Sequence, residues 1–193
     1  MDKINELIET LNLENHLTIE EMPDLDLYMD QIIQIFESKF SSSKRDEDEK
    51  ILTKTMINNY AKGKLFFPIK NKKYSKEHLI LISLIYQMKG ALSIKDIKVA
   101  LNKVNEKITE DDFNIDNLYN SYLYLSEQNR GRFVEDIQES ANEVSRQVSL
   151  LEDKDSNYLE QLLLVASLVN MSNYYRRAAE KIIDEIGNKK ETT

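Results

Sequence analysis

Cysteine is absent from this sequence of 193 residues. Without a thiol the chain can form no disulfide, no thiolate zinc site and no cysteine nucleophile, and a reducing compartment such as the cytoplasm is the setting we expect. Tryptophan is also missing, and only two histidines are present. Enzymes that depend on cysteine are therefore excluded, and those that depend on histidine have few candidates.

Proline and glycine are scarce, with two and four residues respectively. Because both residues interrupt regular structure, their scarcity in a chain with 41% hydrophobic residues predicts a folded, mainly α-helical protein. The longest apolar runs, 79–82 and 162–166, are far shorter than the roughly 20 residues that cross a bilayer. The first residues have no basic, apolar leader either. We therefore expect a cytoplasmic protein with no membrane partner.

Motifs of catalysis are also missing, since the sequence has no Gly-rich phosphate loop and no Gly-x-Ser-x-Gly elbow. His78 occupies the third position of a predicted helix, where a lone histidine is typical of the surface. Two groups of aspartates lack the glycine and glutamate of an EF-hand loop and suit helix N-termini better. The sequence predicts no enzyme, no cofactor and no metal site. The aspartates are Asp24, Asp26 and Asp30, and Asp111, Asp112 and Asp116.

The net charge of −8 is distributed unevenly. Between Lys50 and Lys107 thirteen lysines stand against three acidic residues, so this basic segment carries about +10 and the rest of the chain about −18. One basic segment in an acidic chain indicates a directed contact with a polyanion. A solvated lysine-rich surface explains the charge alone equally well.

Hydrophobic spacing predicts a series of helices joined by loops. The segment 41–50 (SSSKRDEDEK) has no apolar residue and should be an exposed loop. Residues 65–74 contain Pro68 and an Asn-Lys-Lys tip, which predicts a small β-hairpin. Gly131 should interrupt the chain between two helices. The predicted helices are 4–13, 24–40, 53–62, 76–88, 94–104, 113–125, 132–151 and 156–186.

Two C-terminal patterns predict helix packing. From Arg132 the apolar residues step by four or three, which is a heptad-like seam for another helix. The last helix is apolar nearly all round between Leu162 and Met171, so its first half should be buried in a C-terminal helical bundle. The sequence leaves open whether these surfaces dimerise or pack within one subunit. The seam consists of Phe133, Ile137, Ala141, Val144, Val148 and Leu151.

The side chains of the basic segment suit a nucleic-acid duplex. Asparagine can make two hydrogen bonds to adenine, and lysine or threonine can reach guanine or phosphate. Lysines on a hairpin tip can neutralise phosphates beside the groove. The candidate DNA-binding residues are Lys54, Thr55, Asn58, Asn59 and Lys62 on the short helix, Lys64 after it, and Lys70, Lys72, Lys73 and Tyr74 on the hairpin.

The segment Thr55–Leu101, TMINNYAKGKLFFPIKNKKYSKEHLILISLIYQMKGALSIKDIKVAL, resembles the winged DNA-binding domain of MerR-type bacterial regulators. There a recognition helix is followed by Gly-Leu-x-x-Pro, a basic wing ending in Tyr-Ser, and two helices. With LDLYMDQ upstream, the motifs LTKTMINNYAKGKL and KKYSKEHL also resemble the YkrK-like family of bacterial proteins of unknown function. The resemblance implies a MerR-like winged helix-turn-helix fold and a regulatory role.

Two features depart from the MerR pattern. Ten residues, Ser41–Lys50, replace the tight turn of the helix-turn-helix, and lysine and asparagine replace its usual arginines, which gives charge without the bidentate guanidinium. Without cysteine a thiolate metal sensor is ruled out, whereas a small-molecule effector stays open. Its candidate residues are Tyr119, Tyr122, Tyr124, Arg130 and Arg132.

The leading interpretation is a transcriptional regulator that binds double-stranded DNA as a homodimer. Residues 1–22 would form an N-terminal helix or tail, 23–107 the winged helix-turn-helix domain, and 108–193 a dimerisation domain. The alternative is a helical adaptor without enzymatic activity that binds an acidic protein through the same lysines. The operator, the direction of regulation, the effector and the regulated genes are not determined by the sequence.

Overall fold

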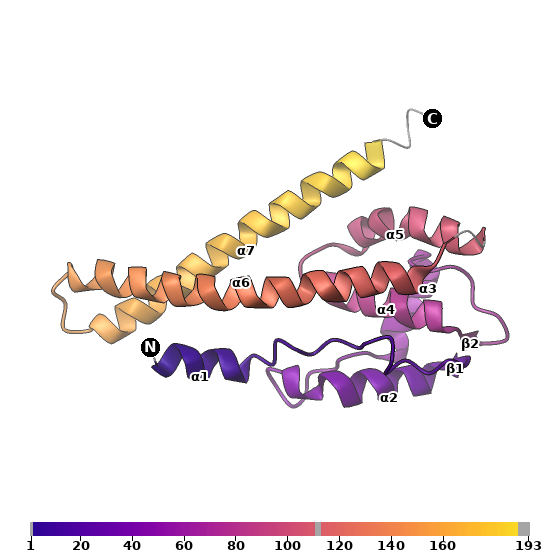
Figure 1. The fold of residues 1–193 in the computed structure, drawn as a ribbon, viewed down its shortest axis with the longest axis horizontal. Coiled ribbons are helices and arrows are strands. Elements are labelled where there is room, and N and C mark those ends of the chain that lie inside the picture. The colour runs from indigo at the N-terminus through magenta and orange to yellow at the C-terminus, as the bar shows by residue number, and fades with distance from the viewer. Residues whose placement is uncertain (1, 111–112, 189–193) are drawn as a thin grey trace. The chain divides into compact units, whose positions relative to one another are not determined.

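The computed structural model describes residues 2–110 and 113–188 of the chain, and the described part is mainly helical with one small antiparallel sheet (Figure 1). The predicted fold class is confirmed at this level. The elements are α1 (Asp2–Thr10), β1 (Leu27–Tyr28), α2 (Met29–Phe40), a 3-10 turn (Ser41–Ser43), α3 (Lys54–Gly63), β2 (Lys73–Tyr74), α4 (Lys76–Met88), α5 (Ile94–Thr109), α6 (Ile115–Ser149) and α7 (Ser156–Asn188).

The chain divides into two compact units. The first, which we call the helical unit, combines Met1–Glu14 with Leu125–Ala179. The second, which we call the mixed unit, combines Asn15–Tyr124 with Glu180–Thr193 and contains both strands. Helices α6 and α7 each contribute residues to both units.

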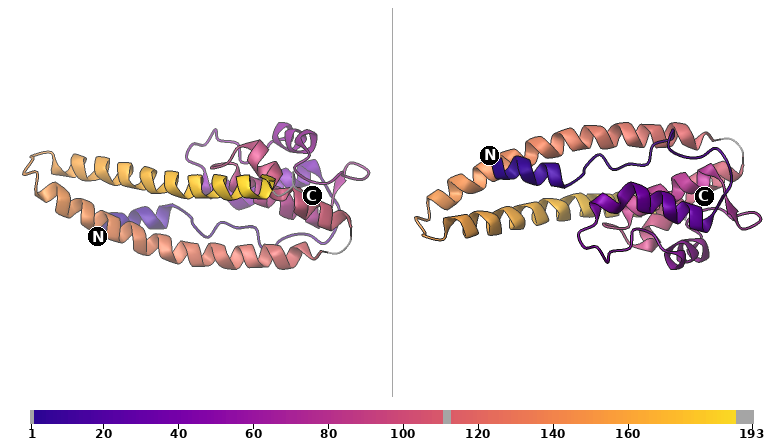
Figure 2. Two further views of the ribbon diagram at one scale, coloured as in Figure 1. Left: turned by 90° about the horizontal axis from the view of Figure 1, so that it is seen from above. Right: turned by 90° about the horizontal axis from the view of Figure 1, so that it is seen from below.

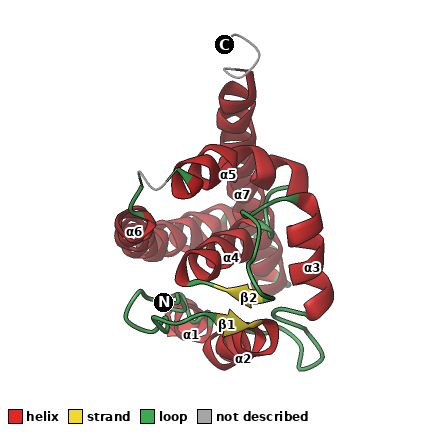
Figure 3. Cartoon of the chain, turned by 90° about the vertical axis from the view of Figure 1, so that its right-hand side faces the viewer, coloured by secondary structure: helices red, strands yellow, loops and turns green. Residues whose placement is uncertain are grey.

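Helix α4 forms the core of the mixed unit. Residues Leu79–Ile82 are fully buried, as a helix that is apolar all round requires. Helix α2 adds Ile32 and Phe36 to this core, and α3 adds Ile57. Figure 3 shows α4 with α5 on one side and the two strands on the other. The basic segment is thus built on a rigid apolar base.

The helix predicted over 24–40 begins only at Met29, so the prediction was wrong at its start. Leu27 and Tyr28 are in strand β1, where they pair antiparallel with Tyr74 and Lys73. The side-chain oxygen of Gln31 accepts a hydrogen bond from the Tyr28 backbone N–H at 2.8 Å and caps the helix there. The strand pairing is long-range, which is why helical spacing alone did not reveal it.

The predicted hairpin is present as a tight turn. Lys70 and Lys73 form a bridge, and Asn71 and Lys72 between them both have positive φ, 52° and 59°. Two left-handed residues are characteristic of a type I′ turn. The strand after this turn pairs with β1 rather than with a strand of its own hairpin. The small sheet therefore connects the turn to the start of α2.

His78 is buried, at 3% exposure, and its predicted surface position is wrong. Its Nδ1 accepts a hydrogen bond from the Ser75 backbone N–H at 3.1 Å, and its Nε2 lies 3.1 Å from the Phe67 carbonyl oxygen. The ring also packs against Phe66, Phe67 and Tyr74. Through these hydrogen bonds and ring contacts, His78 holds the segment that carries the lysine-rich turn against the N-terminus of α4.

In the helical unit, α6 continues without a break through Gly131, contrary to the prediction. Gly131 is exposed, and an added Cβ would meet no atom within 4 Å. A single glycine lowers helix stability by about 1 kcal/mol but does not by itself end a long helix. The helix is therefore one element of 35 residues.

The heptad-like seam of α6 is covered within the helical unit, where Ile137 and Val148 are buried. Close to these residues, Gln138 donates a hydrogen bond to Asn5 of α1 at 2.9 Å, and Ser145 donates one to Glu160 of α7, also at 2.9 Å. Figure 2 shows α6 and α7 running antiparallel from the turn that joins them. Leu151, the last residue of the predicted seam, lies after the helix and is exposed.

The first half of α7 is not buried on several sides, so this prediction was wrong. Half of the large hydrophobic side chains that are exposed in the described part of the chain belong to α7. The helical unit offers α7 only one neighbouring face, and the remaining apolar side chains face solvent. Those in the helical unit are Tyr158, Leu162, Leu163, Val165, Val169, Met171, Tyr174 and Tyr175.

Candidate nucleic-acid interface

Helix α3 carries half of the candidate DNA-binding residues, and its ends are set by local chemistry. The Thr53 hydroxyl accepts a hydrogen bond from the Met56 backbone N–H at 3.1 Å, so Thr53 is the N-cap. At the other end Lys64, not Gly63, adopts the left-handed conformation, with φ of 56°. The N–H groups of Lys64 and Leu65 donate to the carbonyls of Ala61 and Tyr60, which is a Schellman motif.

The five candidate residues of α3 share one exposed face. At 100° per residue they span an arc of about 140°, and the buried Ile57 and Tyr60 lie on the opposite side of the helix. Lys62 lies near the middle of the exposed arc, with Asn58 on one side of it and Thr55 and Asn59 on the other. The set is Lys54, Thr55, Asn58, Asn59 and Lys62, all exposed.

The hairpin presents its lysines differently. Lys70 and Lys72 are exposed, whereas the Lys73 ammonium lies 5.3 Å from the centre of the Tyr28 ring in a cation–π contact. Tyr74 is in the core at 1% exposure, and burial raises the pKa of its hydroxyl. The structure therefore places Tyr74 among the packing residues, away from any surface ligand, although the sequence placed it in the candidate site.

The start of α2 connects α3 to the hairpin. Asp30 pairs with Lys54 at 2.8 Å, and Tyr28, two residues earlier, holds Lys73. Both side chains of the Asp30–Lys54 pair are about two-thirds exposed, so the pair adds little stability and can open. The Asp30 carboxylate thus partly offsets the positive charge at the beginning of α3. Among the described residues, no ion pair holds Lys62, Lys64, Lys70 or Lys72.

Two further lysines belong with this surface, although the sequence reasoning did not select them. A Cβ on Gly63, at the end of α3, would lie 4.0 Å from Ile94 Cγ2, so the first turn of α5 adjoins the end of α3. Lys95 and Lys98 are exposed on that part of α5. Their only sequence signal was membership of the basic segment, because the contact joins residues about thirty positions apart.

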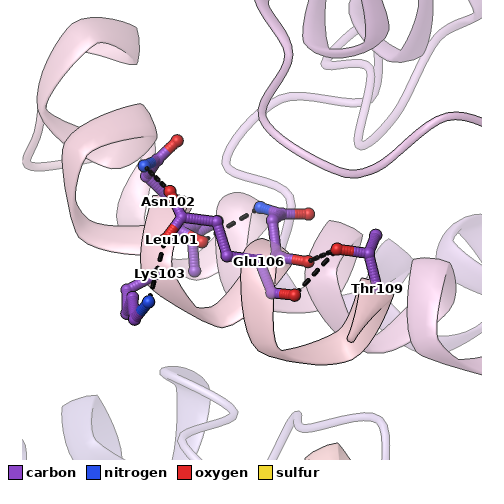
Figure 4. A network of polar contacts seen from close by, with 6 residues as sticks. Leu101, Asn102, Lys103, Glu106 and Thr109 are labelled. Carbon is purple, nitrogen blue, oxygen red and sulfur yellow. Dashed lines mark hydrogen bonds and ion pairs between the residues drawn. The ribbon is translucent and has the colours of Figure 1, made fainter. Parts of the chain in front are cut away.

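Further along α5 several polar groups bond to one another (Figure 4). Glu106 accepts a hydrogen bond from Asn102 at 2.8 Å and pairs with Lys103 at 3.1 Å. Asn105 donates to the carbonyls of Leu101 and Leu65, both at 3.0 Å. Lys103 is therefore a lysine of the basic segment that is already neutralised within its own helix.

The candidate effector residues do not form one site. Tyr119 and Tyr122 stack in the mixed unit, where the Tyr119 hydroxyl donates to the Leu17 carbonyl at 2.7 Å and burial raises its pKa. Tyr124 is exposed in the same unit. Arg130 and Arg132 belong to the helical unit, and Arg130 is paired with Glu14 and Glu127.

A shallow groove of about 670 Å³ lies instead between the segment that precedes α2 and α2 itself. Its walls include Leu17, Pro23, Gln34 and Ser38, and none of the candidate effector residues lines it. In the described part of the chain no cluster of metal-ligating side chains is present, and no helix there is long and apolar enough to cross a membrane.

Comparison with known families places residues 17–122 in a domain of unknown function, DUF1836. The chain belongs to this family, and the matched region covers β1, β2 and helices α2 to α5, with the beginning of α6. No curated protein and no solved structure matches the chain. The whole candidate interface lies inside the matched region.

Proposed function

We propose that the protein is a sequence-specific transcriptional regulator that binds double-stranded DNA as a homodimer. Its mixed unit would act as a winged helix-turn-helix of the kind the sequence resembles in MerR-type and YkrK-like proteins. In this proposal α2 is the first helix, α3 the recognition helix and the type I′ turn the tip of the wing. The C-terminal helices would join two copies on a pseudo-palindromic site.

The exposed face of α3 carries the proposal. Its side chains combine two asparagines, which read base edges, with lysines and a threonine, which reach guanine or phosphate. The opposite face is anchored by Ile57 and Tyr60, so the helix can present these groups in a fixed orientation. A lysine face for general solubility would not require two asparagines among its lysines.

The charges suggest how a duplex would lie. Lys62 and Lys64 at the end of α3, with Lys95 and Lys98 beside them, attract phosphates. Asp30 repels them at the beginning of α3. The sugar-phosphate backbone would therefore follow the lysine-rich end of the helix, while Asn58 and Asn59 face the bases.

The test begins with selection of bound fragments from host genomic DNA by the purified protein. The variant with Asn58→Ala and Asn59→Ala is then compared with the original chain on the selected site and on random duplex. We expect a loss of preference of about 10-fold to 100-fold with nearly unchanged affinity for random duplex, because only base contacts are removed. Asn129→Ala with Asn142→Ala, two exposed asparagines of α6, is the matched control.

Unchanged selectivity in the Asn58 and Asn59 variant would contradict base reading by α3. It would favour the adaptor interpretation, in which lysines bind an acidic protein and the asparagines are not needed for binding. Failure to enrich any genomic fragment would contradict the proposed function as a whole.

A further inference from the structure

Four of the exposed apolar side chains of α7 form an ordered stripe. Tyr158, Leu162, Val165 and Val169 are separated by four, three and four residues, so they lie within about 60° of one another around the helix. All four are roughly half exposed or more. Glu160, which accepts the hydrogen bond from Ser145 of α6, lies on the other side of α7. The stripe therefore faces away from the helical unit.

We infer that this stripe is the surface through which two copies of the chain associate, with their α7 helices packed antiparallel. The inference rests on the proposed function in that two copies act together, and it names where and in which orientation they meet. The seam of α6, the other surface that the sequence offered for dimerisation, is already partly covered in a single chain, where Ile137 and Val148 are buried.

The spacing of the stripe is self-complementary. When α7 is turned end for end about a point between Leu163 and Leu164, Leu162 faces Val165 of the second copy and Tyr158 faces Val169. Each layer then pairs one larger side chain with a valine, as knobs-into-holes packing requires. All four side chains of both copies are covered by this single register.

The charges at the two ends of the stripe support the same register. Asp155 precedes Leu162 by seven residues, and Arg176 follows Val169 by seven, so both continue the stripe. In the antiparallel pair each Arg176 lies within about one helical turn, roughly 6 Å along the axis, of Asp155 in the second copy. The acidic turn 152–155 would thus meet the basic pair Arg176 and Arg177. A parallel pair would instead place like charges together.

Absence of cysteine allows a direct test of orientation. Chains with Tyr158→Cys are mixed with chains with Val169→Cys, without DNA, and disulfide formation is followed under mild oxidation. We expect the mixed pair to cross-link at least about 10-fold faster than either chain with itself. The antiparallel register puts positions 158 and 169 opposite each other, whereas two copies of position 158 lie about 16 Å apart along the axis. Faster cross-linking of like with like would overturn the inference.

Sedimentation of the DNA-free protein tests the surface itself. Val165→Glu should raise the dimer dissociation constant by about 100-fold, because a charge is buried in the stripe. Ile182→Glu is the matched control, since both side chains are 59% exposed on α7 and only Val165 belongs to the stripe. Equal effects of the two substitutions, or a monomeric original chain at about 10 μM, would overturn the inference.

A charge exchange distinguishes loss of the interface from misfolding of a variant. Asp155→Arg or Arg176→Asp alone should weaken the dimer, and both together in one chain should restore it, since each copy then regains its opposite partner. No restoration would count against the antiparallel register. A dimer that binds no DNA would overturn the proposed function but not the α7 surface, whereas a monomer that binds DNA specifically would overturn the α7 surface and the homodimer but leave DNA binding by the mixed unit standing.

Discussion

His78 determines how the lysine-rich turn is held. In the neutral ring Nδ1 accepts the Ser75 N–H, so the proton is on Nε2 and is donated to the Phe67 carbonyl. Protonation of Nδ1 would place its N–H donor opposite the backbone N–H donor of Ser75, and this hydrogen bond would be lost. Burial lowers the pKa of His78, although Phe67, Glu77 and Asp26 act in the opposite direction.

The pH dependence of stability follows from this shift. Because the folded pKa lies below the unfolded value of about 6.5, the unfolded chain binds more protons as the pH falls below that value, and stability is lost. We expect the midpoint of thermal unfolding to fall between pH 6.5 and pH 5, as measured by circular dichroism. His78→Gln should be less stable but flatter across this range. An equally steep decline in the variant would show that another group is responsible.

At the scale of single elements, capping signals were readable from sequence, and helix interruptions were not. Thr53 and Ser93 cap α3 and α5, and their residue types indicate this in the sequence, because a cap involves only neighbouring residues. Gly131 was taken as a break, but the residues on either side of it continue the helix. Gly63, the last residue of α3, is favoured there by packing rather than by backbone freedom, since a Cβ would lie 2.7 Å from Leu65 Cδ1.

These two glycines should respond oppositely to the same substitution. Gly131→Ala is expected to raise the free energy of unfolding by about 1 kcal/mol, since alanine is the better helix former and its Cβ meets nothing. Gly63→Ala should lower it by about 1 kcal/mol or more, because Leu65 is fully buried and cannot move aside freely. Urea unfolding measures both. A stabilised Gly63 variant would mean that Leu65 can repack.

At the scale of the whole molecule, opposite charges are segregated along an acidic chain. A net charge of −8 opposes binding to any polyanion, so the affinity for DNA that we propose would have to come from local lysines. Some of these lysines already form ion pairs within the chain, with Asp30, Asp116 and Glu106. Most of the remaining lysines of the basic segment lie at the end of α3, on the first part of α5 or on the type I′ turn.

Salt dependence separates local from overall charge. Lys72→Glu with Lys73→Glu should weaken binding to all duplexes by a similar factor and reduce the slope of log affinity against log salt by about 1 to 2, since roughly one or two phosphate contacts are lost. Lys103→Glu with Lys181→Glu changes the net charge equally at exposed sites outside the candidate interface and should have a smaller effect. Equal losses in both variants would mean that the turn has no special role.

The sequence by itself determined the helical class, most helix positions, the caps and the exposed face of α3, because these depend on residues within about four positions of one another. The tertiary structure decided the start of α2, the burial of His78 and Tyr74, the approach of Lys95 to the end of α3, and which apolar seam is covered. Each of these depends on a partner distant in the chain. Periodicity shows that an apolar face needs a partner, but only packing shows which one it has.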